Sequence, residues 1–189
     1  MFGFGIIRRV ALLSCVMLGT AAFALAQSNE IEPGNRVGKI RLGMTRQSVH
    51  RTLGQPQGVF SLQRGVAGDY WHSNATGDAL QISYRAGKVF QIEITSNRFS
   101  TPEGLTTESS LREVRKAYGP LRKTAYFRDN TGGTTVNYYE AAGRGITFMF
   151  VNMDSTTDPG NFKPFSIIVH ARGQSAVTAD EGDSDSHRL

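Results

Sequence analysis

The chain has 189 residues with 39% hydrophobic and 20% charged side chains, a composition that excludes fibrous and wholly disordered proteins. Its length suits one ordinary domain or two small ones. The formal net charge is +5 at pH 7, from 21 basic and 16 acidic side chains. The only Cys has no partner with which to form an intramolecular disulfide, so the hydrophobic core must stabilise the fold by itself.

The first 26 residues have the pattern of a secretory signal peptide. The pair Arg8-Arg9 precedes an apolar run over 10–23, and Ala24-Leu25-Ala26 has small residues at both positions that a signal peptidase recognises. We therefore expect a periplasmic or secreted mature chain that starts at Gln27. Losing both arginines lowers its formal charge from +5 to +3.

Leu12-Leu13-Ser14-Cys15 is an alternative processing site, at which a lipid would be attached to Cys15. The apolar run continues beyond Cys15, and this pattern favours cleavage near Ala26 instead. No later stretch approaches the roughly 18–20 apolar residues that cross a bilayer, so we expect no transmembrane span in the mature chain. Nucleic acid is not an expected partner, because the chain is exported.

A ten-residue pattern occurs twice, as TRQSVHRTLG from Thr45 and as SLREVRKAYG from Ser110, with an offset of 65 residues. Each copy begins with a hydroxyl residue that can accept a hydrogen bond from the free N–H groups of a helix start. In the second copy, Ser110 and Glu113 complete a capping box. Each copy ends on a Gly with a Pro just beyond, so the sequence predicts short amphipathic helices over 45–54 and 110–119.

Segments with the period of two that is typical of half-buried strands follow each predicted helix. Aromatic pairs predict an earlier strand in each half, which gives a unit of one helix and about three or four antiparallel strands. The helix should cover the apolar face of the sheet. The inward-facing sets are Leu80, Ile82 and Tyr84, then Phe90, Ile92 and Ile94, and in the second half Ile146, Phe148 and Phe150; the aromatic pairs are Tyr70-Trp71 and Tyr138-Tyr139.

The predicted fold class is therefore α+β, with two tandem repeats over 37–101 and 102–172. Each repeat would have a short helical N-terminal segment packed on an antiparallel sheet, and the two sheets would lie side by side or edge to edge. Residues 173–189 are polar and acidic, with a net charge of −3 from Ser175 onward, and we expect a disordered tail there.

Part of the first repeat resembles a known family. Ile40-Arg41-Leu42-Gly43-Met44-Thr45 and Leu53-Gly54-Gln55-Pro56 are similar to the Gly-Met-Thr helix start and the Leu-Gly-x-Pro turn of the SmpA/OmlA (BamE-like) outer-membrane assembly lipoproteins. The tandem arrangement resembles that of the beta-lactamase inhibitory protein (BLIP-like). These resemblances imply a protein-binding surface on the open face of the sheet, with another envelope or secreted protein as the partner.

The alternation places an apolar set on the outward face of the second predicted sheet. Exposed apolar patches with an aromatic residue at the centre are typical of binding sites. The alternative is that the other repeat or the loop from Asn152 to Lys163 covers this face. The candidate protein-binding residues are Met149, Val151, Ile168 and His170, with Tyr139 as their neighbour.

A second candidate surface is basic, and it would face anionic lipid headgroups of the envelope or an acidic protein. The alternative is an ordinary solvated helix face. Its residues are Arg112, Arg115, Lys116, Arg122 and Lys123.

The sequence lacks the usual signatures of an enzyme. It has no HExxH, no Cys pair and no GxSxG, and its four His residues are scattered along the chain. The oxygen-rich loop 152–161 has ligands for a hard cation but lacks the pattern of an EF-hand, and a Pro-Gly turn explains it more simply. We expect no catalytic residues, no cofactor and no metal.

Three functions remain open at this point. The first is an accessory or assembly role in the cell envelope, and the second is an inhibitor or immunity-type binder of a secreted enzyme. The third is a small-ligand or lipid-binding module that uses a pocket between the repeats, lined by the aromatic pairs Tyr70-Trp71 and Tyr138-Tyr139.

Overall fold

The computed structural model describes residues 29–62, 66–128, 135–152 and 159–177. The predicted signal peptide, the alternative lipid site at Cys15 and most of the oxygen-rich loop lie outside the described residues. Neither of the two described helices has the length and hydrophobicity needed to cross a membrane.

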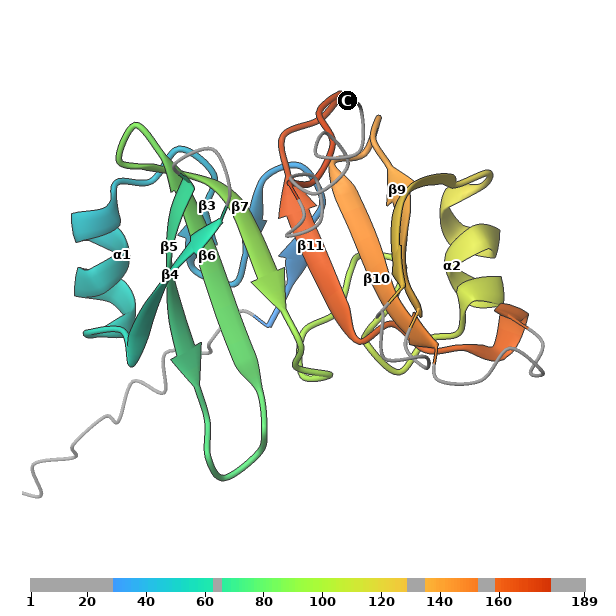
Figure 1. The fold of residues 1–189 in the computed structure, drawn as a ribbon, viewed down its shortest axis with the longest axis horizontal. Coiled ribbons are helices and arrows are strands. Elements are labelled where there is room, and N and C mark those ends of the chain that lie inside the picture. The colour runs from blue at the N-terminus through green and yellow to red at the C-terminus, as the bar shows by residue number, and fades with distance from the viewer. Residues whose placement is uncertain (1–28, 63–65, 129–134, 153–158, 178–189) are drawn as a thin grey trace, which may run out of the picture.

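The described residues form two antiparallel sheets and two α-helices (Figure 1). The small sheet contains β1 (Ile31–Glu32), β2 (Arg36–Val37) and β3 (Ile40–Arg41), and the helices are α1 (Arg46–Leu53) and α2 (Leu111–Tyr118). The large sheet has eight strands in the order β4-β5-β6-β7-β11-β10-β9-β8. These are β4 (Gly58–Leu62), β5 (Val66–His72), β6 (Ala79–Arg85), β7 (Lys88–Ile94), β8 (Arg122–Arg128), β9 (Thr135–Ala141), β10 (Ile146–Asn152) and β11 (Ser166–His170), with a short 3₁₀ helix, η2 (Pro159–Asn161), before β11.

Both predicted helices are present, with the predicted caps. The Thr45 hydroxyl accepts a hydrogen bond from the Ser48 N–H at 3.3 Å. Ser110 and Glu113 form the complete capping box, in which the Glu113 carboxylate accepts from the Ser110 N–H at 2.7 Å. Gly54 and Gly119 end the helices with φ of 84° and 76°, in a region that an L side chain rarely adopts.

The predicted alternation holds in β6 and β10, whose inward residues Ile82, Phe148 and Phe150 are fully or almost fully buried. In β7 the alternation is interrupted by an irregularity in the pairing with β6 near Ser83 and Tyr84. Val89 therefore enters the core in place of Phe90. The Arg85 guanidinium instead lies over the Phe90 ring, with its central carbon 4.6 Å from the ring centroid.

The expected fold class, α+β with two tandem helix-and-sheet repeats, is wrong. The molecule is mostly β, and of the two arrangements expected for the sheets the edge-to-edge one is present: β7 pairs with β11 from Ile94↔Ile167 to Gln91↔His170, which gives one eight-stranded sheet. The sequence also gave no indication of the small β1–β3 sheet. Alternation identifies which residues face a core, but it does not reveal whether a strand edge stays free. Pairing β7 with β11 satisfies two rows of backbone N–H and C=O groups that would otherwise be edges.

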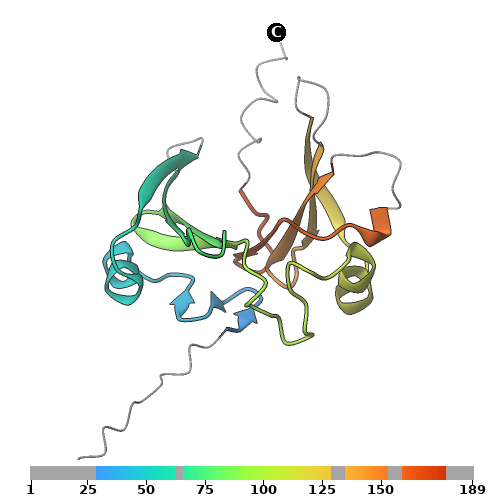
Figure 2. The ribbon, with the colours of Figure 1, turned by 90° about the horizontal axis from the view of Figure 1, so that it is seen from below.

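The two faces of the large sheet differ (Figure 2). The helices and the small sheet lie along one face, here called the covered face. Ile31, Val37 and Ile40 of the small sheet, Val49 of α1 and Val114 of α2 pack there into one hydrophobic core. On the opposite side of the sheet, here called the open face, none of the described residues forms a helix.

Candidate functional site

The open face of the second half of the sheet carries a small apolar cluster. Tyr138 of β9, Met149 of β10 and Ile168 of β11 contact one another there, with Val136 beside them. Tyr138 and Met149 are directly paired across the two strands, so their side chains leave the sheet on the same side. The cluster also contains Ala176, from the segment that follows β11.

That segment, Ser175–Val177, is held against the open face mainly by side chains of the sheet. The Gln91 side-chain amide donates to the Val177 carbonyl at 3.0 Å and accepts from the Val177 N–H at 2.8 Å. One glutamine thus satisfies both backbone groups of one residue. Recognition of this kind depends on the backbone of the bound segment and not on its side chain.

Two charged residues hold the other end of Ser175–Val177. The Arg122 guanidinium donates to the Ser175 hydroxyl and to the Glu140 carboxylate, at 2.9 Å each. The Ser175 hydroxyl also donates to Glu140 at 3.3 Å. Between these anchors, Ala176 is only 4% exposed. The disorder expected from residue 173 therefore does not begin there, and residues 178–189 lie outside the described part of the chain.

The candidate protein-binding residues do not all lie together. Met149 and Val151 are partly exposed, whereas Ile168 and His170 are buried. Tyr139 is on the covered face, where its ring packs edge-on against Phe150 with centroids 5.4 Å apart. The face is covered in part by Ser175–Val177, a segment that was not among the predicted covers.

A polar cluster lies beneath this segment on the open face. His170 Nε2 is 2.9 Å from the Thr147 hydroxyl and 3.9 Å from Glu140 Oε1, and burial lowers the pKa of His170 below its usual 6.5. Glu140 Oε1 is buried and has no hydrogen-bond partner among the described residues. Nearby, the Ser166 hydroxyl donates to Glu93 at 2.7 Å, and burial raises the pKa of that carboxyl.

The candidate basic residues are split between two elements and two faces. Arg112, Arg115 and Lys116 are exposed on α2, and the Arg115 guanidinium lies 5.7 Å from the centroid of the Tyr139 ring. Arg122 pairs in register with Glu140, whereas its neighbour Lys123 pairs with Tyr139, so the two side chains leave β8 on opposite faces. The structure therefore does not assemble the five cations into one patch.

Sequence reasoning missed an ion-pair cluster on the covered face. Asp69 of β5 is fully buried, and both of its oxygens are paired with the Arg46 guanidinium. His50 Nε2 lies 2.7 Å from the same carboxylate. These partners lower the pKa of Asp69, although burial opposes them. Two features of the sequence could have indicated this cluster. Arg46 and His50 have the i,i+4 spacing that places them on one side of a helix, and Asp69 is on the same side of its strand as the apolar Trp71.

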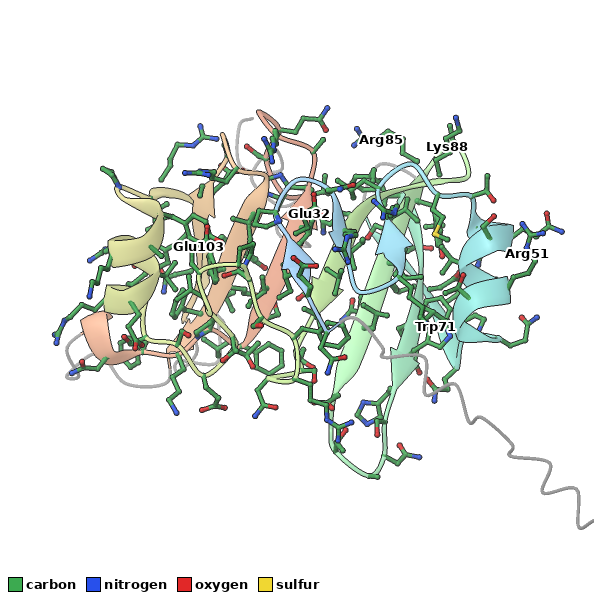
Figure 3. All side chains as sticks on the ribbon, turned by 180° about the vertical axis from the view of Figure 1, so that it is seen from behind. Glu32, Arg51, Trp71, Arg85, Lys88 and Glu103 are labelled. Carbon is green, nitrogen blue, oxygen red and sulfur yellow. The ribbon has the colours of Figure 1, made fainter. Side chains whose placement is uncertain are left out.

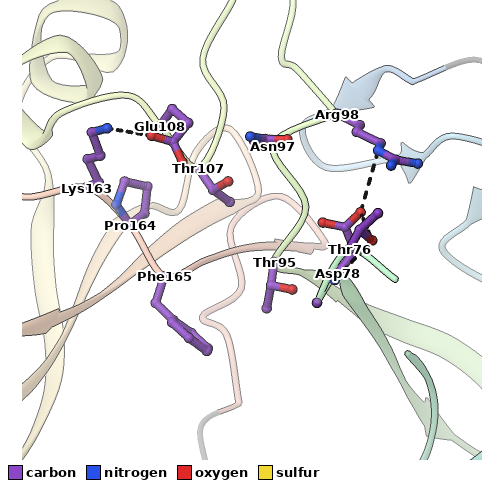
Figure 4. Close-up of a pocket in the computed structure, with 11 residues that line it drawn as sticks. Thr76, Asp78, Thr95, Asn97, Arg98, Thr107, Glu108, Lys163, Pro164 and Phe165 are labelled. Atoms are coloured by element: carbon purple, nitrogen blue, oxygen red, sulfur yellow. Dashed lines mark hydrogen bonds and ion pairs between the residues drawn. The ribbon is translucent and has the colours of Figure 1, made fainter. Parts of the chain in front are cut away.

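No three or more His, Cys, Asp or Glu side chains in the described part of the chain are grouped so that they could hold a metal ion. A hollow of about 480 Å³ lies just beyond the end of β7 and just before the start of β11 (Figure 4). An ion pair stands on each side of it, Lys163 with Glu108 and Arg98 with Asp78. Its lining is largely polar, apart from Pro164 and the exposed Phe165.

No protein-family model and no curated protein matches the chain. Among solved structures, partial likeness extends to an extracellular protein containing an SCP domain from Bacillus anthracis, with a TM-score of 0.46, 10% identity and coverage of 72% of this chain and 50% of that one. A cysteine-rich secretory protein from Staphylococcus aureus gives a TM-score of 0.44 and 10% identity over 76% of this chain and 50% of that one. For the uncharacterized protein yfeY from Escherichia coli, the TM-score is 0.48 and the sequence identity is 13%. The match covers 74% of this chain and 97% of that one.

The chain spans about half the length of the first two of these structures. At these identities and TM-scores the likeness does not extend to function. None of the three is described as an SmpA/OmlA or BLIP-like protein, so those resemblances stay predictions.

Proposed function

We propose that this chain is an exported, non-enzymatic binding protein of the cell envelope, with an accessory or assembly role. Its partner is another envelope or secreted protein. Export is supported by the sequence of the first 26 residues, with Arg8-Arg9 before an apolar run and small residues at the expected cleavage site. The envelope role is supported by the similarity of residues 40–45 and 53–56 to the SmpA/OmlA motif.

The observation that carries the binding proposal is the way the open face holds Ser175–Val177. Gln91 bonds both backbone groups of Val177, while Tyr138 and Ile168 receive the small side chain of Ala176. The same combination of backbone hydrogen bonds and apolar contacts recognises extended segments of partner proteins. Met149 and Val151 remain partly exposed beside this segment and supply apolar area for a larger contact.

An affinity capture with crosslinked envelope extract and culture medium tests this proposal. The bait is the chain from Gln27 to Leu189, compared with its Met149→Asp variant. A buried carboxylate at an interface costs several kcal/mol, so we expect one protein to be enriched by wild type and lost with Met149→Asp. Gln47→Asp adds the same charge at an exposed position of α1 and should retain the partner.

Circular dichroism and thermal unfolding of Met149→Asp separate lost binding from lost folding. A folded variant that captures the same protein as wild type would place the contact elsewhere and contradict the proposed face. If Met149→Asp does not fold, Val151→Lys repeats the comparison from a partly exposed position on the same strand.

The role of the segment Ser175–Val177 is tested by Gln91→Ala. Losing two hydrogen bonds should loosen the segment by about 1–2 kcal/mol and speed hydrogen exchange of the Val177 amide. Gln81→Ala, which removes an equal side chain from the neighbouring strand β6, should change neither quantity.

A further inference from the structure

A second hollow, of about 460 Å³, lies on the covered face of the first half of the molecule. It is enclosed by the hairpin of β2 and β3, the last turn of α1 and the ends of β5, β6 and β7. Its volume is within the range of about 300–1,000 Å³ that small-molecule sites occupy. It lies on the opposite side of the sheet from Ser175–Val177, so it is separate from the proposed protein-binding face.

Large apolar side chains form much of the wall of this cavity. Leu53 of α1, Leu80 of β6 and Phe99 after β7 line it, and all three are only partly buried although they pack against the core. Trp71 of β5 lies among them, beside α1 (Figure 3). An apolar ligand body that fills the cavity would complete the burial of these four side chains.

Trp71 also has an unused hydrogen-bond donor. Its indole Nε1 is buried and has no acceptor among the described residues. A buried donor without an acceptor costs roughly 1–3 kcal/mol, and buried indole N–H groups usually have a partner. Because this nitrogen is buried, a ligand oxygen in the cavity would reach it after a small shift of the neighbouring side chains, and it would then supply the missing acceptor.

The position of Trp71 is fixed by the ion-pair cluster next to it. The His50 ring packs edge-on against the Trp71 ring, with centroids 6.1 Å apart. His50 is itself held by Asp69, and Asp69 by Arg46. The indole ring is therefore supported on one side before a ligand binds, which reduces the entropy that is lost on binding.

The charges around the cavity favour an anion. Arg98 and Asp78 both line it and form an ion pair at 3.6 Å, so their charges offset each other. Lys39, in the turn between β2 and β3, also lines it and has no carboxylate partner among the described residues. The lining thus has a net charge of +1 from an exposed ammonium group at the mouth.

We propose that this cavity binds a small amphipathic carboxylate. The apolar body packs between Trp71, Leu80 and Phe99, a carboxylate oxygen accepts the hydrogen bond of the Trp71 indole N–H, and Lys39 pairs with the remaining negative charge. The cavity lies on the covered face, so ligand binding there does not depend on a protein partner at the open face.

Decanoate is a suitable probe, because Trp71 is the only Trp of the chain and reports on the cavity directly. In the full chain from Gln27, we expect a saturable change in Trp71 fluorescence as decanoate is added. In a nitrogen-15 NMR titration, the indole N–H resonance should move downfield as its hydrogen bond forms. Decyltrimethylammonium has the same chain length but no acceptor and the opposite charge, and it should produce neither change.

Lys39→Gln tests the charge requirement. Because an ion pair at the surface is modest in strength, the affinity for decanoate should fall about threefold to tenfold. The affinity for decanol, which has no charge, should stay the same. Lys116→Gln removes an equal charge from the exposed face of α2, far along the chain from the cavity, and should leave both affinities unchanged.

Thr52→Phe tests the location. Thr52 is exposed on α1 and lines the cavity, so a phenyl ring there should fill the mouth and abolish the decanoate response in a protein that still folds. An unmoved indole N–H resonance at saturating decanoate overturns the proposal, as does equal binding of the two oppositely charged probes. Retention of full decanoate affinity by Lys39→Gln also overturns it, whatever the result of the protein capture experiment.

Discussion

In the described part of the chain, two carboxylate side chains are fully buried, one on each face of the large sheet, and their surroundings differ. Asp69, on the covered face, has both oxygens paired with Arg46 and one also with His50. Glu140, on the open face, uses one oxygen for Arg122 and Ser175 and leaves the other without a partner among the described residues. Asp69 is thus part of a completed structural contact that fixes α1 to the sheet. Glu140 lies in a surface that retains unsatisfied polarity.

Replacing Asp69 with Asn is expected to have the largest effect. The side chain keeps its shape, but Arg46 and His50 lose the charge that they share, and the free energy of unfolding should fall by about 2–4 kcal/mol. Urea denaturation measures this loss. Asp78→Asn is the matched control, because the partner of Asp78 is the exposed Arg98 at 3.6 Å, and it should cost less than about 1 kcal/mol.

The pH dependence of stability, compared between wild type and Asp69→Asn, tests the same contact independently. The pKa of Asp69 is lowered in the folded protein, so its contribution to stability is present above its unfolded pKa of about 3.9 and is lost as the pH falls through the folded value. Wild type should therefore lose stability more steeply than Asp69→Asn below about pH 4. Parallel curves would show that the carboxylate is not held as the structure indicates.

His170 should make the open face sensitive to mild acid. Burial lowers the pKa of its imidazole below 6.5 in the folded protein. Between pH 6.5 and that lower pKa, the unfolded chain therefore binds a proton at His170 and the folded chain does not. Stability should decrease over that interval by at most about 1.4 kcal/mol per pH unit. His170→Gln should flatten this part of the curve.

Glu140→Gln should have the smallest effect and thereby sharpens the contrast with Asp69. Arg122 is 67% exposed and stays solvated when its partner becomes neutral, and Glu140 Oε1 has no hydrogen bond to lose among the described residues. We expect a change in unfolding free energy below about 1 kcal/mol. The pKa of His170 should fall further, because the Glu140 charge raises it, and NMR titration would show this. A loss as large as that of Asp69→Asn would mean that the two carboxylates are equivalent after all.

The local structure of this chain could be predicted because it depends on near neighbours. Ser110 and Glu113 are three residues apart, and the inward sets of β6 and β10 follow from simple alternation. Predictions failed where structure depends on distant pairings. The β7–β11 contact, which joins two expected sheets into one, leaves no mark in either strand alone, because both are apolar on one side in either arrangement.

The same limit applies to the sites. The apolar character of Met149 and Ile168 on the open face could be predicted from alternation, but the segment over them comes from residues that look like the start of a polar tail. Tyr139, which the sequence places as a neighbour of the open-face set, lies on the covered face with Phe150. The pairing of Asp69 with Arg46 joins residues 23 positions apart, a distance over which no periodicity extends.

The contact between β7 and β11 also has a consequence for how the chain folds. Ser166 and Glu93, which bond across it, are 73 residues apart in sequence, so the centre of the sheet depends on one of the longest loop closures in the molecule. Contacts of this kind slow folding, and until they form the edge of β7 is free to pair with another chain. With the export proposed above, the chain would emerge unfolded from a membrane channel and spend that interval with its central strand unprotected. We therefore expect its yield to depend more on substitutions in β11 that delay this pairing than on equally destabilising substitutions in α1.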